Sequence, residues 1–158
     1  MALTTDQTPG GLAPEDERRL AADLFNHTWE LLETADRTPA QIDRMIHAAH
    51  ASRFHWDQVG DAVKLAAGEW QCSRVYAVLG RSEPSEWHAR RSLAICDAGG
   101  ITGFFRAAAN EALARALLVA GDRAGAAAAE AEAWSAAEAI DDDEDRQIFE
   151  QDMASLPR

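Results

Sequence analysis

The side chains best suited to chemistry are histidines, and four of the five lie in the first part of the chain as His27, His47, His50 and His55. His47 and His50 are three positions apart, so one face of a helix presents both. Imidazole and carboxylate groups suit zinc, iron or copper. His27, His47, His50 and Glu69 therefore form a candidate divalent-metal site. The alternative is packing or surface histidines, because no HExxH or duplicated ExxH motif is present.

Acid–base chemistry without a metal is a second interpretation, in which His27, His50 and Glu69 are the catalytic residues of a small helical enzyme. His27 falls in an apolar stripe, where burial would disfavour its charged form and a nearby Glu69 would oppose that effect. Arg53 or Arg74 beside them would hold an anionic substrate. This hypothesis predicts that the three side chains converge within hydrogen-bond reach, directly or through a water.

Charged residues also interrupt the apolar faces of successive helices. At 100° per residue, Arg53, Arg74, Glu111 and Arg115 all project onto faces that should be apolar. Buried charge is unfavourable unless it is paired. One interpretation is a structural network in which Arg53 and Arg74 neutralise Glu69 and Glu111. The other is that these faces line a groove, where the charges meet water or a ligand.

The elements that carry these residues are predicted to be helices throughout. Alanine, leucine, glutamate, arginine and glutamine dominate, all are good helix formers, and no stretch alternates as a strand would. Pro14 and the pair Thr38–Pro39 mark helix starts, and Gly80 and Gly121 mark ends. The expected helices span 14–36, 39–59, 61–79, 82–99, 102–120, 122–140 and 144–155, after a disordered arm at 1–13.

Two of the expected helix pairs repeat a pattern. GEWQCSRVYAVLG ends at Gly80 and ANEALARALLVAG ends at Gly121. Aligning Gly80 with Gly121 places Tyr76 opposite Leu117 and Leu79 opposite Ala120. In the middle of the helix that follows, the small residues Ser92 and Ala133 are also aligned. This pattern resembles the tetratricopeptide repeat (TPR), although the 41-residue spacing exceeds the usual repeat of about 34. The longer connection CDAGGITGFF accounts for the difference.

The TPR resemblance covers most of residues 14–140 and implies a short right-handed solenoid with a concave binding groove. Its inward positions would be Trp29, Trp70, Arg74, Glu111 and Arg115, with Arg53 added from the helix projection. A binding module of this kind predicts that Trp70, Arg74, Glu111 and Arg115 are exposed in the groove. Residues 141–158 would form an acidic capping helix and tail, with Ile148, Phe149 and Met153 on its apolar side. The alternative is a compact bundle of six to seven helices.

Composition limits the partners. The net charge of −12 makes a nucleic-acid backbone an unsuitable partner. No segment is long and apolar enough to span a membrane, and the start lacks a signal-peptide pattern. Cys72 and Cys96 show neither metal nor redox spacing, which favours a reduced, cytoplasmic protein. We expect a peptide, a partner protein or a small, even anionic, molecule as ligand; a homodimer is a third, structural hypothesis.

Overall fold

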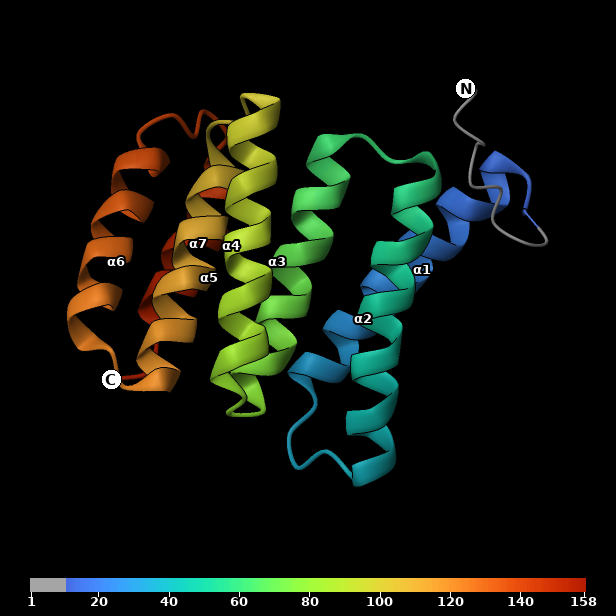
Figure 1. The fold of residues 1–158 in the computed structure, drawn as a ribbon, viewed down its shortest axis with the longest axis horizontal. Coiled ribbons are helices and arrows are strands. Elements are labelled where there is room, and N and C mark those ends of the chain that lie inside the picture. Colours follow the sequence, from blue (N-terminus) through green and yellow to red (C-terminus); the bar gives the residue numbers. More distant parts are fainter. Residues whose placement is uncertain (1–10) are drawn as a thin grey trace, which may run out of the picture.

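The protein is all-α. The computed structural model describes residues 11–158, and this part contains seven helices and no strand (Figure 1). Their bounds are α1 Pro14–Glu33, α2 Pro39–Val59, α3 Ala62–Val78, α4 Ser82–Gly99, α5 Phe104–Ala120, α6 Arg123–Ala137 and α7 Asp143–Ala154. Most of the predicted disordered arm, residues 1–13, lies outside the described part. The predicted fold class is confirmed.

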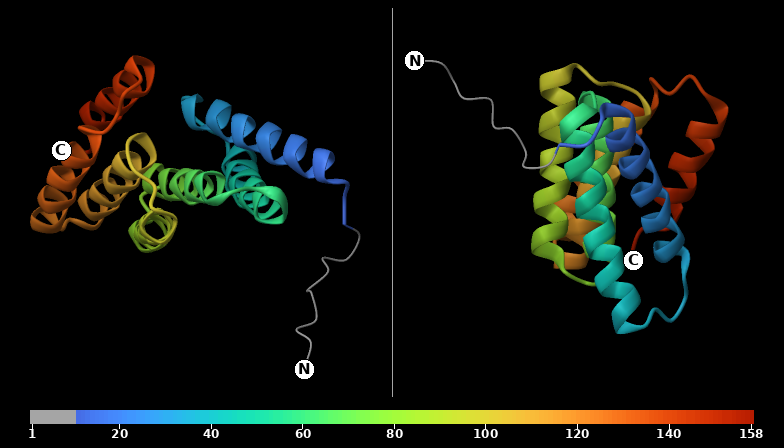
Figure 2. Two further views of the ribbon diagram at one scale, coloured as in Figure 1. Left: turned by 90° about the horizontal axis from the view of Figure 1, so that it is seen from above. Right: turned by 90° about the vertical axis from the view of Figure 1, so that its right-hand side faces the viewer.

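Consecutive helices pack as antiparallel pairs, α1 with α2, α3 with α4 and α5 with α6, and each pair packs against the next. Seen from above, the row of helices is curved (Figure 2). Helices α1, α3, α5 and α7 lie along the inner side of the curve, whereas α2, α4 and α6 lie along the outer side. The first helix of every pair therefore faces the concave side.

Several helix ends differ from the expected ones for backbone reasons. Helix α1 stops at Glu33, three residues early, and Asp36 in the following loop has a left-handed φ of 49°. Helix α5 starts at Phe104, because Gly103 before it has a φ of 66° that a helix cannot contain. The predicted glycine after α3 is confirmed, since Gly80 has a φ of 69°.

The end of α1 depends on one arginine. Arg37 Nη1 donates to the backbone oxygens of Leu31, Leu32 and Thr34 at 3.1, 2.9 and 2.8 Å. Replacing Arg37 by Met keeps the apolar stem and removes the donors, so we expect a loss of about 1–2 kcal/mol in the free energy of unfolding by urea. Arg19→Met is the control, because the Arg19 side chain is 69% exposed and pairs only with Asp16. Equal losses in the two variants would contradict this role.

Small residues bring the helices close together, and larger ones fill the C-terminal core. Phe149 and Met153 of α7 are buried against Ala133 and Ala137 of α6. The expectation that Ile148 shares this packing is wrong, since it is 46% exposed on the concave side. Within residues 11–158, no helix has the length and apolar character needed to cross a membrane.

Candidate functional site

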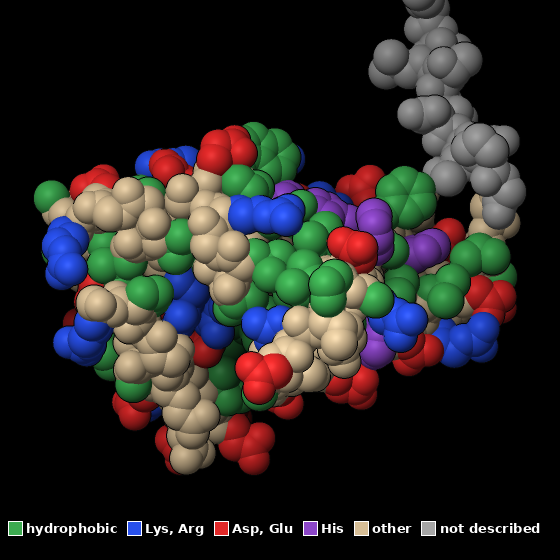
Figure 3. All heavy atoms as spheres, turned by 90° about the horizontal axis from the view of Figure 1, so that it is seen from below, with side chains coloured by type: hydrophobic (Ala, Val, Ile, Leu, Met, Phe, Trp, Pro, Cys, Tyr) green, Lys and Arg blue, Asp and Glu red, His purple; other side chains and the backbone are tan. Residues whose placement is uncertain are grey.

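The concave side contains a hollow of about 630 Å³ between α1, α3, α5 and α7. Figure 3, seen from below, shows it as a notch in the lower edge of the molecule, with hydrophobic and basic side chains inside and acidic ones around it. Six of the fifteen lining residues are aromatic, namely Phe25, Trp29, Trp56, Trp70, Phe104 and Phe105. An aromatic-lined concavity of this volume is in the size range of ligand sites.

The aromatic wall is continuous across helices. The rings of Trp29 and Trp70 lie 5.2 Å apart, and those of Trp70 and Phe104 lie 6.0 Å apart in an edge-to-face arrangement. Within the described residues, the buried Trp70 Nε1 has no hydrogen-bond acceptor. A buried donor without a partner is unfavourable by roughly 1–3 kcal/mol. Trp70 therefore keeps an unsatisfied donor at the wall of the hollow.

The charged side chains that line the hollow are mostly acidic. Glu33 of α1 and Asp145 and Asp152 of α7 contribute carboxylates, against the single ammonium group of Lys64. Asp152 is the one of these carboxylates that pairs with an arginine, Arg74, at 3.1 Å. Charge near the aromatic wall is therefore net negative.

An ion-pair network lies beneath the hollow. Glu111 of α5 is fully buried and accepts from Arg74 at 3.1 Å and from Arg115 at 2.7 Å. Arg115 also donates to the Asp152 and Ser155 backbone oxygens at 2.9 and 3.1 Å, and so ties α5 to the end of α7. The structural-network interpretation is confirmed for these residues.

The pKa directions follow from burial and pairing in this network. Burial acts to lower the pKa of Arg74, but Glu111 and Asp152 raise it overall. Burial lowers the pKa of Arg115, although Glu111 opposes that effect. Burial raises the pKa of Asp152, with Arg74 opposing. The guanidinium groups are thus held by carboxylates of the chain itself.

The expected exposure of Trp70, Arg74, Glu111 and Arg115 in the groove is wrong, because all four are buried. Glu111 is 0% exposed, and Arg74 and Arg115 are buried because they satisfy one another's charges beneath the wall rather than in it. Of the residues predicted for the groove, Trp29 and Trp70 line the hollow. Arg74 approaches the hollow through its ion pair with Asp152 and with its guanidinium carbon 5.8 Å from the Trp29 ring centroid.

The opposite face of α3 carries a second polar group. Arg53 of α2 crosses α3 at Gly68, where an added Cβ would lie only 2.8 Å from Arg53 Cδ. From there Arg53 Nε donates to Glu69 at 3.0 Å, and the other Glu69 oxygen is 2.7 Å from His88 Nδ1 of α4. Burial acts to raise the pKa of Glu69, but the hydrogen bond and charge of His88, with Arg53, lower it overall. Glu69 is therefore a carboxylate with both oxygens engaged.

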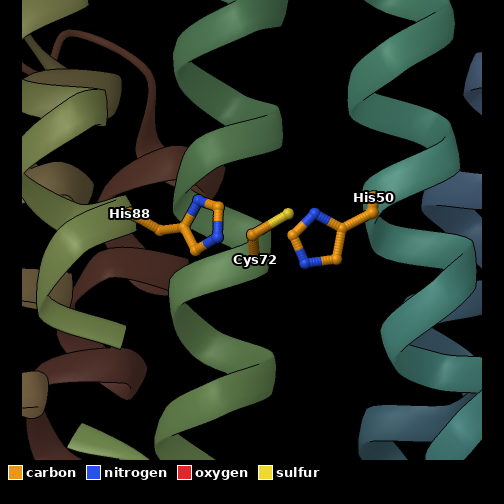
Figure 4. A group of neighbouring side chains, drawn as sticks. All are labelled: His50, Cys72 and His88. Carbon is orange, nitrogen blue, oxygen red and sulfur yellow. The ribbon is translucent and has the colours of Figure 1, made fainter. Parts of the chain in front are cut away.

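Next to Glu69, three ligand-type side chains meet from three helices. One donor atom each of His50, Cys72 and His88 lies within 4.8 Å of the others. Figure 4 shows the Cys72 sulfur between the two rings, directed toward His50. Burial raises the pKa of the Cys72 thiol to about 12, with Glu69 adding to the effect. Burial lowers the pKa of His50, as does the neighbouring His88.

The cluster is bounded by hydroxyl and aromatic groups. His50 Nε2 is 2.9 Å from the Tyr76 hydroxyl. The Tyr76 and His88 rings are nearly parallel, with centroids 5.7 Å apart. We define the metal-type cluster as His50, Cys72 and His88, with Glu69 and Tyr76 as its hydrogen-bonding neighbours.

The predicted catalytic and metal residues are only partly brought together. His50 and Glu69 lie in one connected group, whereas His27 pairs with Glu30 of its own helix at 3.1 Å and is about 40% exposed. The predicted placement of His27 inside an apolar stripe is wrong, since α1 turns that position toward solvent. His47 is exposed, although its charge acts on His50. Arg53 pairs with Glu69 and so is not free to clamp an anion.

Sequence reasoning missed Cys72 and His88. Cys72 could have been found from helical spacing, because Glu69, Cys72 and Tyr76 fall on one face of α3 within seven residues. His88 follows a separate turn, and only the packing of α4 on α3 brings it to that face. Its adjacency to Trp87 gave no indication of this.

Comparison with known proteins found no match. No protein-family model matches the chain, no curated protein resembles it significantly in sequence, and no solved structure matches its fold at a significant level.

Proposed function

We propose that this chain is a TPR-like binding module whose concave hollow holds a peptide segment of a partner protein, one that carries apolar side chains and at least one basic side chain. The observation that carries the proposal is the continuous aromatic wall on the concave side. Large apolar concavities on a folded surface commonly mark interaction sites. Supporting the TPR-like assignment, the first helix of each pair faces this side.

Charge favours a basic rather than an acidic peptide. Glu33 and Asp145 line the hollow together with Trp29 and Trp56, so a basic side chain of the peptide would meet carboxylates there. Cations of the chain itself already contact these rings, with Lys64 Nζ 5.2 Å from the Trp56 centroid and the Arg74 guanidinium 5.8 Å from the Trp29 centroid. Cation–aromatic contacts contribute about 0.5–2 kcal/mol, more where water is excluded. Arg53, Arg74 and Arg115 do not offer an anion site, because Glu69, Glu111 and Asp152 already pair with them.

The shape favours a peptide. Helices α1 and α7 stand at the two ends of the curve (Figure 2), and both contribute residues to the hollow between them. A chain segment lying over α3 and α5 would place its apolar side chains on the aromatic wall.

The test is an immobilised array of twelve-residue peptides in which a central arginine is flanked by leucine and phenylalanine, with a matched series that has glutamate in place of arginine. We expect binding to the arginine series. The affinity is then measured by the fluorescence anisotropy of a fluorescein-labelled member of that series. Trp29→Ala and Glu33→Lys should each lower that affinity about tenfold or more, since aromatic anchors at interfaces are commonly worth over 1 kcal/mol.

Two matched controls separate the hollow from the rest of the surface. Trp134→Ala removes a tryptophan that is 47% exposed and lies on α6, away from the hollow. Glu138→Lys reverses an exposed charge at the end of α6, as Glu33→Lys does at the end of α1. Both should leave the affinity within twofold. Equal binding of the arginine and glutamate series, or equal losses in the control variants, would rule the proposal out.

A further inference from the structure

The cluster of His50, Cys72 and His88 combines one thiol and two imidazoles from α2, α3 and α4. Thiolate and imidazole are ligands of zinc and of other late first-row metals. All three donor atoms lie within 4.8 Å of one another. Tetrahedral zinc, with bonds of about 2.0–2.3 Å, needs such atoms about 3.5 Å apart. Because the three side chains already face one another, rotation about their side-chain bonds would bring the donor atoms to that separation.

Each imidazole has its outer nitrogen engaged and its inner one directed at the cluster. His88 Nδ1 is held by Glu69 at 2.7 Å and His50 Nε2 by the Tyr76 hydroxyl at 2.9 Å. This leaves His88 Nε2 and His50 Nδ1, and in the described part of the chain neither makes a hydrogen bond. In Figure 4 these nitrogens are the ones toward Cys72. Metal-binding histidines characteristically give their other N–H to a carboxylate or a similar acceptor.

The charges around the cluster suit a dication. A Cys72 thiolate and the Glu69 carboxylate would supply two negative charges, and Arg53 on the far oxygen of Glu69 fixes that carboxylate toward His88. In a purely structural group, Cys72 would serve as a small apolar side chain beside Met45, Ala49 and Val75. Its sulfur makes no hydrogen bond among the described residues, so it is free to act as a ligand.

We propose that His50 Nδ1, Cys72 Sγ and His88 Nε2 bind one transition-metal cation of the zinc type, with Glu69 and Tyr76 as positioning residues. This inference concerns the side of α3 that faces away from the hollow, and it does not rest on the peptide-binding proposal. Three protein ligands leave a fourth coordination position for water or a small ligand.

Binding is an exchange of a proton for the metal and involves no redox step. The S–H bond of Cys72 breaks, its proton goes to the solvent, and the sulfur electron pair forms the bond to the metal. The two ring nitrogens each donate a lone pair, while their partner nitrogens keep the protons that Glu69 and Tyr76 accept. Proton release on metal binding is general for thiolate sites.

The experiment is a titration of the reduced full-length protein with Co²⁺, followed by absorption. We expect a sulfur-to-cobalt charge-transfer band in the near ultraviolet that saturates at one equivalent and is abolished by one equivalent of Zn²⁺. Cys72→Ser should remove the band. Cys96→Ser is the matched control, because Cys96 is equally buried yet lies outside the cluster, and it should keep the band in full.

Glu69→Gln and Tyr76→Phe test the positioning residues. Loss of such a partner typically weakens metal affinity about 10–100-fold, so both variants should require more Co²⁺ while reaching the same band at saturation. If Glu69 and Tyr76 had a purely structural role, their replacement would not weaken the metal affinity while leaving the band at saturation unchanged. A zinc-dependent rise in Tm in wild type and Cys96→Ser, absent in His50→Asn, gives a second readout should Cys72→Ser fail to fold. No band in wild type, or one that survives in Cys72→Ser, would overturn the proposal.

Discussion

Glu111→Ala is expected to lower the free energy of unfolding by about 3–5 kcal/mol, the cost of leaving a buried charge uncompensated. The Glu111 carboxylate is fully buried and accepts from both Arg74 and Arg115. Without it, Arg74 keeps only Asp152 as an acidic partner. Urea unfolding followed by tryptophan fluorescence measures the loss.

A double replacement distinguishes the effect of an unpaired charge from the effect of lost side-chain packing. Arg74→Met with Glu111→Leu removes one cation together with the carboxylate and keeps much of the apolar volume. Replacement of a buried ion pair by apolar residues is often neutral or stabilising, so the double variant should be more stable than Glu111→Ala by about 2 kcal/mol or more. A double variant as unstable as Glu111→Ala would show that packing, rather than an unpaired charge, causes the loss.

Phe149→Ala is expected to lower the free energy of unfolding by a similar amount, about 3–5 kcal/mol. Phe149 is 1% exposed and is the largest of the fully buried side chains within residues 11–158. It joins α7 to α5 and α6 through Ala107, Ala133 and Ala137, which are too small to fill the cavity left behind. Differential scanning calorimetry and urea unfolding measure the change.

The adjacent residue provides the control. Ile148→Ala removes a large apolar side chain from the same helix, but this one is 46% exposed and faces the hollow. We expect a stability loss below about 1 kcal/mol, and a measurable decrease in affinity for the arginine-containing peptide. Comparable losses of stability in the two variants would mean that α7 is not anchored through Phe149.

Much of the fold was predictable because it depends on local signals. Proline at helix starts and glycine after helix ends locate the helix bounds to within a few residues, as at Pro39 and Gly80. The errors arose where a tertiary contact decides the end. Helix α1 stops where Arg37 reaches back to its carbonyls, and no periodicity in the sequence encodes that contact.

The candidate site was less predictable, because it depends on which faces meet. Helical projection correctly placed charged residues on inward faces, and it indicated that Arg74 pairs with Glu111. It could not show that these pairs lie below an aromatic wall rather than in it. His88 joins Cys72 only through the packing of α4 on α3, so spacing within single helices could not show that these two residues meet.

The link from Arg115 to the end of α7 also has a consequence for synthesis of the chain. Helices α1 to α6 pack on their neighbours in chain order, so each pair can form soon after it leaves the ribosome. The partners of Arg115 at Asp152 and Ser155 are translated after α1 to α6. Before α7 docks, Arg115 and Glu111 lack the cover that α7 gives them. Docking of α7 is therefore expected to exclude water from this network, and ribosome-bound chains ending before α7 should remain sensitive to protease around α5.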